Sequence, residues 1–304
     1  MTASIAVSDV VADALRAGRP VVALETTLVT HGLPRPDGLR VATALEEVVR
    51  DGNATPATIG IVAGRLHVGL TAAELARLAD TPGVVKVNPG NMAALIAGGG
   101  SGSTTVAATL VAAARTGIRV LTTGGIGGVH RGASETGDVS ADLTALGHFP
   151  VAVVCAGAKA ILDLPRTREM LETLGVPVLG AGCDEFPAFY RRTSGLQVDA
   201  RCDGLAALAA AIRAHFDLGL PGGVVVANPI PSAAELPAAL HDQALATALA
   251  EAARAGLRGR DVTPFLLERM RVLTAGASLR ANEALLLHNA RLAAELATLL
   301  ARSA

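Results

Sequence analysis

Short runs of β-branched residues alternate along this chain with longer stretches in which alanine and leucine recur at helical spacing. This alternation is typical of helices layered on a sheet and argues against an all-β sandwich. The pattern predicts strands at residues 20–30, 57–62, 84–87, 118–122, 150–156, 176–179 and 223–227. It predicts helices at residues 36–51, 71–79, 103–116, 158–174, 232–256 and 278–302. The sequence therefore predicts an α/β fold with a helix-rich C-terminal third.

The length and punctuation of the chain favour a single domain over residues 1–304. No repeat, Ser/Pro-rich linker or low-complexity block divides the 304 residues. Gly52, Gly117, Gly175 and Gly256 each follow a helical run, where a left-handed C-cap favours glycine. Hydrophobic residues make up 51% of the chain but aromatic residues only 2%, so the core has to be built from Ala, Val, Leu and Ile.

Charge and cysteine content exclude several classes of protein. The formal net charge is -1 without long charge runs, so there is no electrostatic footprint for nucleic acid or an anionic membrane, and a small molecule is the expected partner. Cys155, Cys183 and Cys202 lie far apart, which argues against a disulfide framework and a zinc site. The N-terminus lacks a basic n-region, and no uninterrupted apolar stretch reaches the roughly 18 residues of a membrane span. We expect a soluble protein of the cytoplasm.

Lysine is scarce in this chain. Lys86 and Lys159 are the only two lysines among 26 basic residues, which leaves 24 arginines. A guanidinium stays protonated, whereas a desolvated lysine amine can lose its proton and attack a carbonyl. Lys159 follows an apolar run at an expected strand-to-helix turn, where the helix macrodipole and the apolar surroundings both favour the neutral amine. Lys159 is therefore a candidate nucleophile; a solvent-facing lysine in an arginine-biased sequence is the alternative.

A glycine-rich segment, residues 122–138, follows an expected strand. Its glycines let the backbone approach a ligand closely. His130 stands where the third glycine of a dinucleotide fingerprint would be, and neither lysine has the context of a Walker A motif. Backbone N–H groups together with His130 and Arg131 would suit a phosphate or a sugar. A glycine-rich turn with a basic surface pair is the alternative.

Three carboxylates stand where they could carry chemistry. Asp138 and Asp142 could bind a hard cation or act as an acid and base pair. Asp142 could equally lie in the first turn of a helix that has Ser140 as its N-cap. Glu25 lies in a strand-like run, where a buried carboxylate is costly unless paired or protonated, so it is either a site residue or a solvent-facing strand end. We interpret His31 as a turn histidine.

Two other segments are less specific. Residues 99–106 lead into a helix with Ser and Thr at its start, which suits either an anion held on helix N–H groups or an ordinary capped helix. Asn228 stands in an Asn-Pro-Ile-Pro turn after a strand, and Asn282 lies in a helix that is otherwise full of Leu and Ala. Such an amide is either on the surface or in reach of a ligand.

Six motifs, taken in order, closely resemble the pseudouridine-5′-phosphate glycosidases, also called the indigoidine synthase A-like family. They are ALETT at 23–27, TGGIGGVHRG at 123–132, SADL at 140–143, VCAGAK at 154–159, VANPIP at 226–231 and VTPFLL at 262–267. The resemblance runs from about residue 5 to residue 297. It departs after Lys86, where relatives often carry an arginine-rich segment and this chain has Val-Asn-Pro-Gly-Asn-Met.

The resemblance implies a three-layer α/β/α fold around a mixed sheet, usually in a homotrimer. It implies an enzyme that reversibly cleaves the carbon–carbon glycosidic bond of pseudouridine 5′-phosphate, giving uracil and ribose 5-phosphate. In that chemistry the ribose ring opens, and a lysine imine at C1′ serves as the electron sink while the bond breaks. A divalent metal, Mn²⁺ or another such as Mg²⁺, is the implied cofactor.

Matched residue by residue, the resemblance gives Lys159 as the nucleophile and Glu25 as the proton donor. Asp138 falls on the metal-ligand position, with Asp142 as the alternative. The implied substrate-binding residues are Lys86, Val106, His130, Ser140, Ala141, Asp142 and Asn282. Two other functions stay open: a Schiff-base phosphosugar lyase or aldolase, which would use Lys159 equally, and a non-catalytic sugar-phosphate-binding protein.

Overall fold

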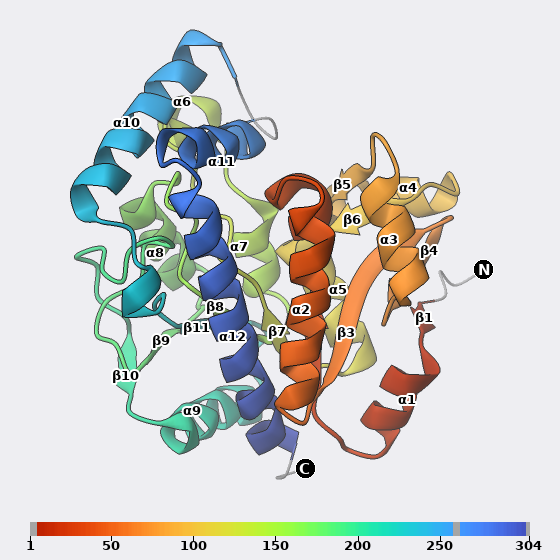
Figure 1. Ribbon diagram of the computed structural model, residues 1–304. Helices are drawn as coiled ribbons and strands as arrows, with labels where there is room; N and C mark the ends of the chain where they lie inside the picture. The colour runs from red at the N-terminus through yellow and green to blue at the C-terminus, as the bar shows by residue number, and fades with distance from the viewer. Residues whose placement is uncertain (1–4, 258–261, 302–304) are drawn as a thin grey trace.

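A single connected sheet runs through the computed structural model, which describes residues 5–257 and 262–301 (Figure 1). The strand order is β1-β4-β3-β2-β7-β8-β11-β9-β10, and β6 joins β3 to β5. The strands are β1 Ala6–Val7, β2 Val21–Leu24, β3 Thr55–Val62, β4 Arg65–Val68, β5 Val85–Val87, β6 Gly102–Thr104, β7 Val120–Thr122, β8 Ala152–Cys155, β9 Val178–Ala181, β10 Ala200–Cys202 and β11 Val224–Ala227. Only the β3–β4 and β3–β6 pairs are antiparallel, so the sheet is mixed.

Helices cover both faces of this sheet. In Figure 1, α2 and α12 lie side by side across the front of the strands, and α5 packs against β2, β3 and β7. The helices are α1 Asp9–Arg16, α2 Asp37–Asp51, α3 Ala72–Asp80, α4 Pro89–Ala97, α5 Val106–Thr116, α6 Ala133–Thr136, α7 Ala141–Leu146, α8 Leu164–Thr173, α9 Leu205–Asp217, α10 Ala238–Arg254, α11 Val262–Leu273 and α12 Ala277–Ala301, with a π-helix η1 Leu28–Gly32 and a 3-10 turn η2 Ser232–Ala234. The expected three-layer α/β/α architecture with a helix-rich last third is confirmed.

The central strands are apolar at every position except Thr122 because both of their faces are covered. β2, β7, β8 and β11 are buried at every position. Parallel strands between two helix layers read as continuous β-branched runs, which is why the sequence located them. β4 escaped prediction because Arg65 and His67 interrupt its pattern. It forms because Ala63 and Gly64, at φ 47° and 74°, turn the chain tightly back along β3.

Small side chains let the front helices approach each other closely. A Cβ added at Gly52, the C-cap of α2, would lie 2.5 Å from the Cβ of Ala294 in α12. Gly52 has φ -79°, so the expected left-handed cap there is wrong. Gly117, Gly175 and Gly256 do have positive φ, as expected. Gly52 is thus needed for packing rather than for its backbone conformation.

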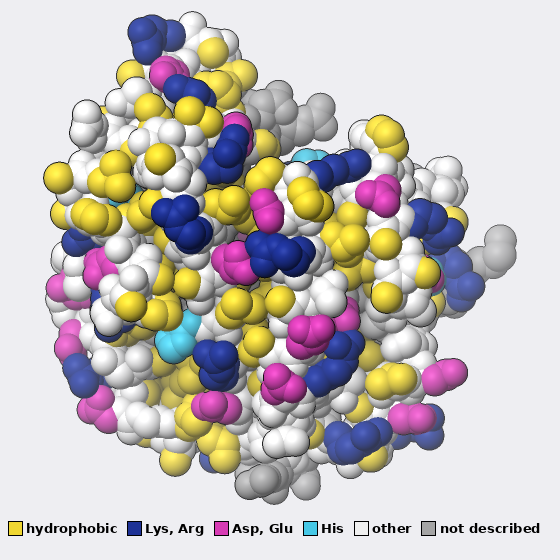
Figure 2. Space-filling model, in the orientation of Figure 1, with side chains coloured by type: hydrophobic (Ala, Val, Ile, Leu, Met, Phe, Trp, Pro, Cys, Tyr) yellow, Lys and Arg dark blue, Asp and Glu magenta, His cyan; other side chains and the backbone are white. Residues whose placement is uncertain are grey.

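The longest helix, α12, is the one described helix that is long and apolar enough to span a membrane by composition alone. It packs against β2, β7 and β8 and also contacts α2 and α9. Its buried residues include two asparagines, Asn282 and Asn289. This is the environment of a core helix. On the face of the molecule that carries α2 and α12, acidic and basic side chains are interspersed (Figure 2), in keeping with the net charge of -1.

Two predicted boundaries are wrong, and both lie beside the candidate site. The strand predicted at 20–30 ends at Leu24, because the Thr26 hydroxyl binds the carbonyl of Ile59 and the chain then enters η1. The helix predicted at 158–174 begins only at Leu164. Asp163 caps it by accepting from the N–H of Arg166 at 3.1 Å, and Pro165 occupies its first turn.

Other boundaries shift less. Residues 103 and 104 of the helix predicted at 103–116 belong to β6, and α5 starts after the N-cap Thr105. The helix predicted at 232–256 is broken before α10 by Pro237. The last residue of the helix predicted at 278–302 lies outside the described residues. The prediction missed the elements β1, β4, β6, β10, α1, α4, α6, α9 and α11, and it offered α7 only as an alternative reading of Ser140 and Asp142.

Candidate active site

The candidate residues converge at the carboxyl ends of the central strands. Glu25 directly follows β2, Thr123 follows β7, and Lys159 stands in the loop after β8. This edge of a parallel sheet is where open α/β folds bind ligands. Two adjoining chambers of one cavity meet here and share Glu25, Thr27, Lys86 and Lys159.

The two chambers differ in character. The polar chamber is completed by Thr105, Val106, Gly127, His130, Ser140, Asp142 and Leu162. The apolar chamber is completed by Leu28, His31, Gly32, Leu33, Thr123, Gly124, Gly125, Phe189, Pro264, Leu267, Asn282 and Leu286. Both lysines and the buried carboxylate therefore lie where a polar and an apolar part of one ligand would meet.

Lys159 is positioned by two glycine-containing segments that lie against each other. Its N–H donates to the carbonyl of Ile126 at 3.1 Å, and the N–H of Ile126 donates to the carbonyl of Gly157 at 3.0 Å. Gly157 has φ 76°, and a Cβ there would lie 1.9 Å from the carbonyl oxygen of Pro187, so only glycine fits. The expected helix N-terminus beside Lys159 is wrong, because α8 starts five residues later in the chain, at Leu164. Lys159 is half-buried in the wall of the cavity, and no described helix begins next to it.

Glu25 is buried at the end of β2, with 7% of its surface exposed. The solvent-facing alternative is wrong. Burial raises the pKa of the Glu25 carboxyl above its ordinary value, while the cation of Lys159 and the hydroxyl of Thr123, which donates to Oε1, act in the opposite direction. The net effect favours a protonated Glu25, which is the form that a proton donor needs.

Lys86 lies on β5 and reaches the same cavity. Burial lowers the pKa of its amine, and the nearby cation of Lys159 lowers it further. Asp142, Glu25 and Asp138 oppose this shift. The two lysines of the chain, Lys86 and Lys159, thus line the same cavity although they are 73 positions apart in the sequence.

Asp142 ties two elements together. Its Oδ1 accepts from the N–H of Ala107 in α5, and its Oδ2 accepts from the N–H of Gly127, both at 2.8 Å. Asp142 is 5% exposed, and its own N–H donates to Ser140, the N-cap of α7. The helix-start reading of these residues is therefore correct. Both carboxylate oxygens are engaged by backbone donors, which does not favour Asp142 as a metal ligand.

His130 lines the polar chamber, and Asp138 lies beside it outside the chamber. His130 Nδ1 lies 3.9 Å from Asp138 Oδ2. Burial lowers the pKa of His130, while Asp138 acts in the opposite direction. Asp138 is half-buried and lines a wider hollow beyond His130. Among residues 5–257 and 262–301, no cluster of three or more His, Cys, Asp or Glu side chains could hold a metal.

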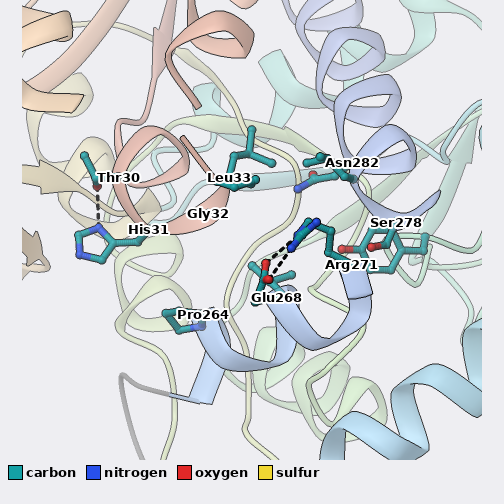
Figure 3. Close-up of a pocket in the computed structure, with 13 residues that line it drawn as sticks. Thr30, His31, Gly32, Leu33, Pro264, Glu268, Arg271, Ser278 and Asn282 are labelled. Atoms are coloured by element: carbon teal, nitrogen blue, oxygen red, sulfur yellow. Dashed lines mark hydrogen bonds and ion pairs between the residues drawn. The ribbon is translucent and has the colours of Figure 1, made fainter. Parts of the chain in front are cut away.

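The remaining predicted residues are divided between the chambers. Val106 opens α5 in the polar chamber, and Ser140 lines it as well. Asn282, on α12, is 9% exposed and lines the apolar chamber. Figure 3 shows Asn282 and Leu33 at the hollow that continues outward from this chamber, with the Glu268–Arg271 ion pair on its other side. Ala141 begins α7 but is not among the described residues that line the cavity.

Sequence reasoning missed several cavity residues. The Phe189 ring packs against Gly125 so closely that a Cβ on Gly125 would lie 2.6 Å from it, and Phe189 itself has φ 60°. No local sequence pattern predicts this contact. Thr123 was visible only as part of a glycine-rich segment. His31 lines the apolar chamber, yet its Nδ1 lies 2.6 Å from the Thr30 hydroxyl and its ring is turned toward Thr30 (Figure 3), so the turn-histidine interpretation describes its local contacts.

Comparison with known proteins decides the family. A profile of the family described as "Indigoidine synthase A like protein" matches residues 10–299. This chain belongs to that family. It is 53% identical over 297 residues to a pseudouridine-5′-phosphate glycosidase of Jannaschia sp., covering 98% of both chains. It is 50% identical over 297 residues to the enzyme of the same name from Caldanaerobacter subterraneus subsp. tengcongensis, covering 98% of this chain and 97% of the relative.

Solved structures agree with this assignment. The crystal structure of the prealnumycin C-glycosynthase AlnA in complex with ribulose 5-phosphate is 41% identical, with a TM-score of 0.91, over 98% of this chain and 97% of that one. An indigoidine synthase A-like protein from Thermotoga maritima is 37% identical with a TM-score of 0.87, and the match covers 94% of each chain. The family resemblance expected from six motifs is confirmed.

The hydrogen bonds of Asp142 predict a structural role that Asp138 does not share. Asp142→Asn replaces one accepting oxygen by an NH₂ group that faces a backbone donor, so we expect the free energy of unfolding to fall by about 2 kcal/mol. Asp138→Asn should change it by less than about 0.5 kcal/mol, as for an ordinary surface substitution. Urea denaturation of both variants provides the measurement. Equal losses in the two would contradict this role.

Proposed function

We infer that this chain is a pseudouridine-5′-phosphate glycosidase, which cleaves the carbon–carbon glycosidic bond to give uracil and ribose 5-phosphate. The observation that carries this inference is the placement of Lys159 and Glu25 where a polar and an apolar chamber join. The names of relatives at 50–53% identity give the same activity. The bound ribulose 5-phosphate of AlnA supports a phosphosugar as the ligand class.

The polar chamber suits the phosphosugar. Lys86 and the start of α5 at Thr105 and Val106 face it, and a helix N-terminus with a nearby cation favours an anion. The apolar chamber suits a flat base, because the Phe189 ring and leucine side chains supply its walls. The Asn282 amide offers one donor and one acceptor side, which matches the alternating N–H and C=O groups of uracil.

The proposed reaction uses Lys159 as the nucleophile. The bond from C1′ to the ring oxygen breaks while Glu25 gives that oxygen a proton, and the deprotonated amine of Lys159 bonds to C1′. The nitrogen, now an ammonium, gives one proton to the Glu25 carboxylate and so regains its lone pair. The bond from C1′ to uracil then breaks: its electron pair stays with the uracil carbon, which takes up that proton from Glu25, and the nitrogen lone pair forms the protonated imine. Water hydrolyses the imine to release ribose 5-phosphate and the free amine. The sum is substrate plus water to uracil plus ribose 5-phosphate, and the same steps run in reverse.

We propose Mn²⁺, or another divalent cation such as Mg²⁺, as the cofactor, with Asp138 as its ligand. One half-buried carboxylate beside His130, with no cysteine in the described lining of the same hollow, would suit a hard cation that keeps most of its water. Such an ion supplies positive charge next to a phosphosugar. The residues of the chain on this side, His130 and Lys86, orient the same anionic end.

A homotrimeric assembly and a cytoplasmic location are also proposed, on the family resemblance. Cys155, Cys183 and Cys202 are all free thiols, which suits a reducing compartment. No specific observation favours either alternative function. A Schiff-base aldolase would use Lys159 in the same way, so Lys159 does not distinguish it. A non-catalytic binding protein would not need a buried acid next to an amine. Sedimentation in solution would measure the assembly state.

Turnover should depend on the amine of Lys159. We expect the parent protein to release uracil from pseudouridine 5′-phosphate, and borohydride to fix the sugar phosphate on Lys159 by reducing the imine. Lys159→Arg should lose activity by at least about 10⁴-fold with its fold intact, because a guanidinium cannot form the imine. Peptide mass spectrometry locates the label. Lys86→Arg, the matched control, keeps the trappable amine, so labelling lost there but retained in Lys159→Arg would refute the mechanism.

Glu25→Gln should lower the rate of uracil release by about 10² to 10⁴-fold, the usual loss for a general acid. The release of uracil by the variant and the parent is compared directly.

The free energy of unfolding of Glu25→Gln should depend on pH differently from that of the parent. Since burial raises the pKa of Glu25, the protonated carboxyl stabilises the folded parent below the ordinary value of 4.5, and this contribution is lost as pH rises through the raised pKa. The Gln variant should therefore gain stability relative to the parent as the pH rises above 4.5 and through the raised pKa of Glu25. Denaturant unfolding at several pH values measures this, and a difference that shrinks with rising pH would exclude the raised pKa.

Chelation should abolish uracil release, and Mn²⁺ or Mg²⁺ should restore it. Asp138→Asn should weaken Mn²⁺ binding by about tenfold or more, because a neutral amide is a poorer ligand for a hard cation. Glu135→Gln removes an exposed carboxylate from the same outer hollow and should leave the affinity unchanged. Titration calorimetry compares the two variants. Unaltered affinity in Asp138→Asn would assign the ion elsewhere.

A further inference from the structure

Among the residues that the structure describes, Thr123 supplies the neutral side-chain group that donates a hydrogen bond to the buried carboxylate of Glu25. Thr123 is 3% exposed, and its Oγ1 donates to Glu25 Oε1. The other groups that act on this carboxylate are charged: Lys159, Lys86 and Asp142, with His31 and His130 on the walls of the same cavity. Thr123 therefore holds one oxygen of Glu25 in a fixed direction, while the charges that act on it come from three other segments, those of Lys86, Asp142 and Lys159.

The backbone of Thr123 is itself held from two sides. Its N–H donates to the carbonyl of Val154 in β8 at 3.1 Å. Its carbonyl accepts from Asn289 Nδ2 in α12 at 2.8 Å, and Asn289 Oδ1 accepts from Asn228 Nδ2 at 2.9 Å. Asn289 is 0% exposed and Asn228 5%. A buried amide pair is costly unless its hydrogen bonds are made, so this chain of contacts is a rigid support for the end of β7.

We propose that Thr123 is a positioning residue that tunes Glu25: its hydroxyl limits how weak an acid the buried carboxyl becomes and fixes the oxygen that faces the substrate. This rests on the proposed role of Glu25 as proton donor. A hydrogen bond to a carboxylate stabilises the charged form, whereas burial disfavours it. Without the hydroxyl the carboxyl would hold its proton more tightly and transfer it less readily, which lowers the efficiency of a general acid.

The chain offers a matched control next to this residue. Thr122 is also buried, with 3% exposure, but its hydroxyl points to the carbonyl of Val154 at 3.5 Å and not to Glu25. Thr122→Val and Thr123→Val remove the same atoms from adjacent positions. Thr123→Ser keeps the hydroxyl at the site, and Thr123→Cys replaces it by a weaker S–H donor of similar size.

The test is the pH profile of uracil release, together with ¹³C NMR titration of the Glu25 carboxyl, assigned by its loss in Glu25→Gln. In Thr123→Val we expect the titration of Glu25, and the high-pH limb of the rate, to move upward by about one pH unit, and kcat to fall about tenfold or more. Thr123→Ser and Thr122→Val should follow the parent, and Thr123→Cys should lie between.

Each outcome bears on one claim. A parent that releases no uracil removes the proposed function, yet the NMR titration still tests whether Thr123 sets the pKa of Glu25. An active parent with an unshifted Thr123→Val overturns the inference, as does an equal shift in Thr122→Val. If Thr123→Val does not fold, a Thr123→Cys variant that titrates as the parent does overturns it instead.

Discussion

The register of the parallel strands β2, β7 and β8 is the constraint on which the site depends. Leu24 pairs with Thr122, and Thr122 pairs with Val154, so these three strands end at nearly the same level. Residues that directly follow them, Glu25 and Thr123, are therefore neighbours. Register in such a sheet is fixed because both faces are buried, and a slip of one residue would turn every side chain to the opposite layer. The helices bury the two faces of the sheet, and the common level of the strand ends places Glu25 next to Thr123.

Electrostatics at this edge is a balance between burial and compensation. A carboxyl and two amines share one cavity, and burial alone disfavours the charge on Glu25 and on Lys86. Each offsets part of the other's cost, while an anionic phosphate would offset the remaining positive charge. Asp142 adds its negative charge to this balance, and backbone N–H groups from α5 and the glycine-rich segment donate to both of its oxygens. It fixes the wall against which the phosphosugar would lie.

The division of the cavity into two chambers follows from the layers. The polar chamber is built from the loop before α7 and the start of α5, where the N–H groups of Ala107 and Gly127 hold the Asp142 carboxylate in the wall. The apolar chamber is lined by η1, α11 and α12, which bring leucine and proline side chains together with one amide, Asn282, and the loop between β9 and β10 adds the Phe189 ring. A ligand with a charged end and a flat, hydrogen-bonding end matches this asymmetry. The same α12 reaches the far side of Thr123 through Asn289, so one helix contributes both to the base side and to the support of the acid.

The sequence by itself determined the α/β class, the central strands, and the candidate roles of Lys159 and Glu25. Buried parallel strands leave a continuous apolar run, and two lysines among 26 basic residues are a compositional signal that needs no structure. Tertiary structure decided the rest. The strand at 20–30 stops at Leu24 because Thr26 binds a distant carbonyl, and α8 starts after Lys159 because Asp163 caps it. Thr123, Phe189 and Asn289 acquire their roles only through partners far away in the chain. The local sequence pattern shows which positions are buried. The hydrogen bonds between distant elements form only when the layers pack together, so the sequence pattern does not show them.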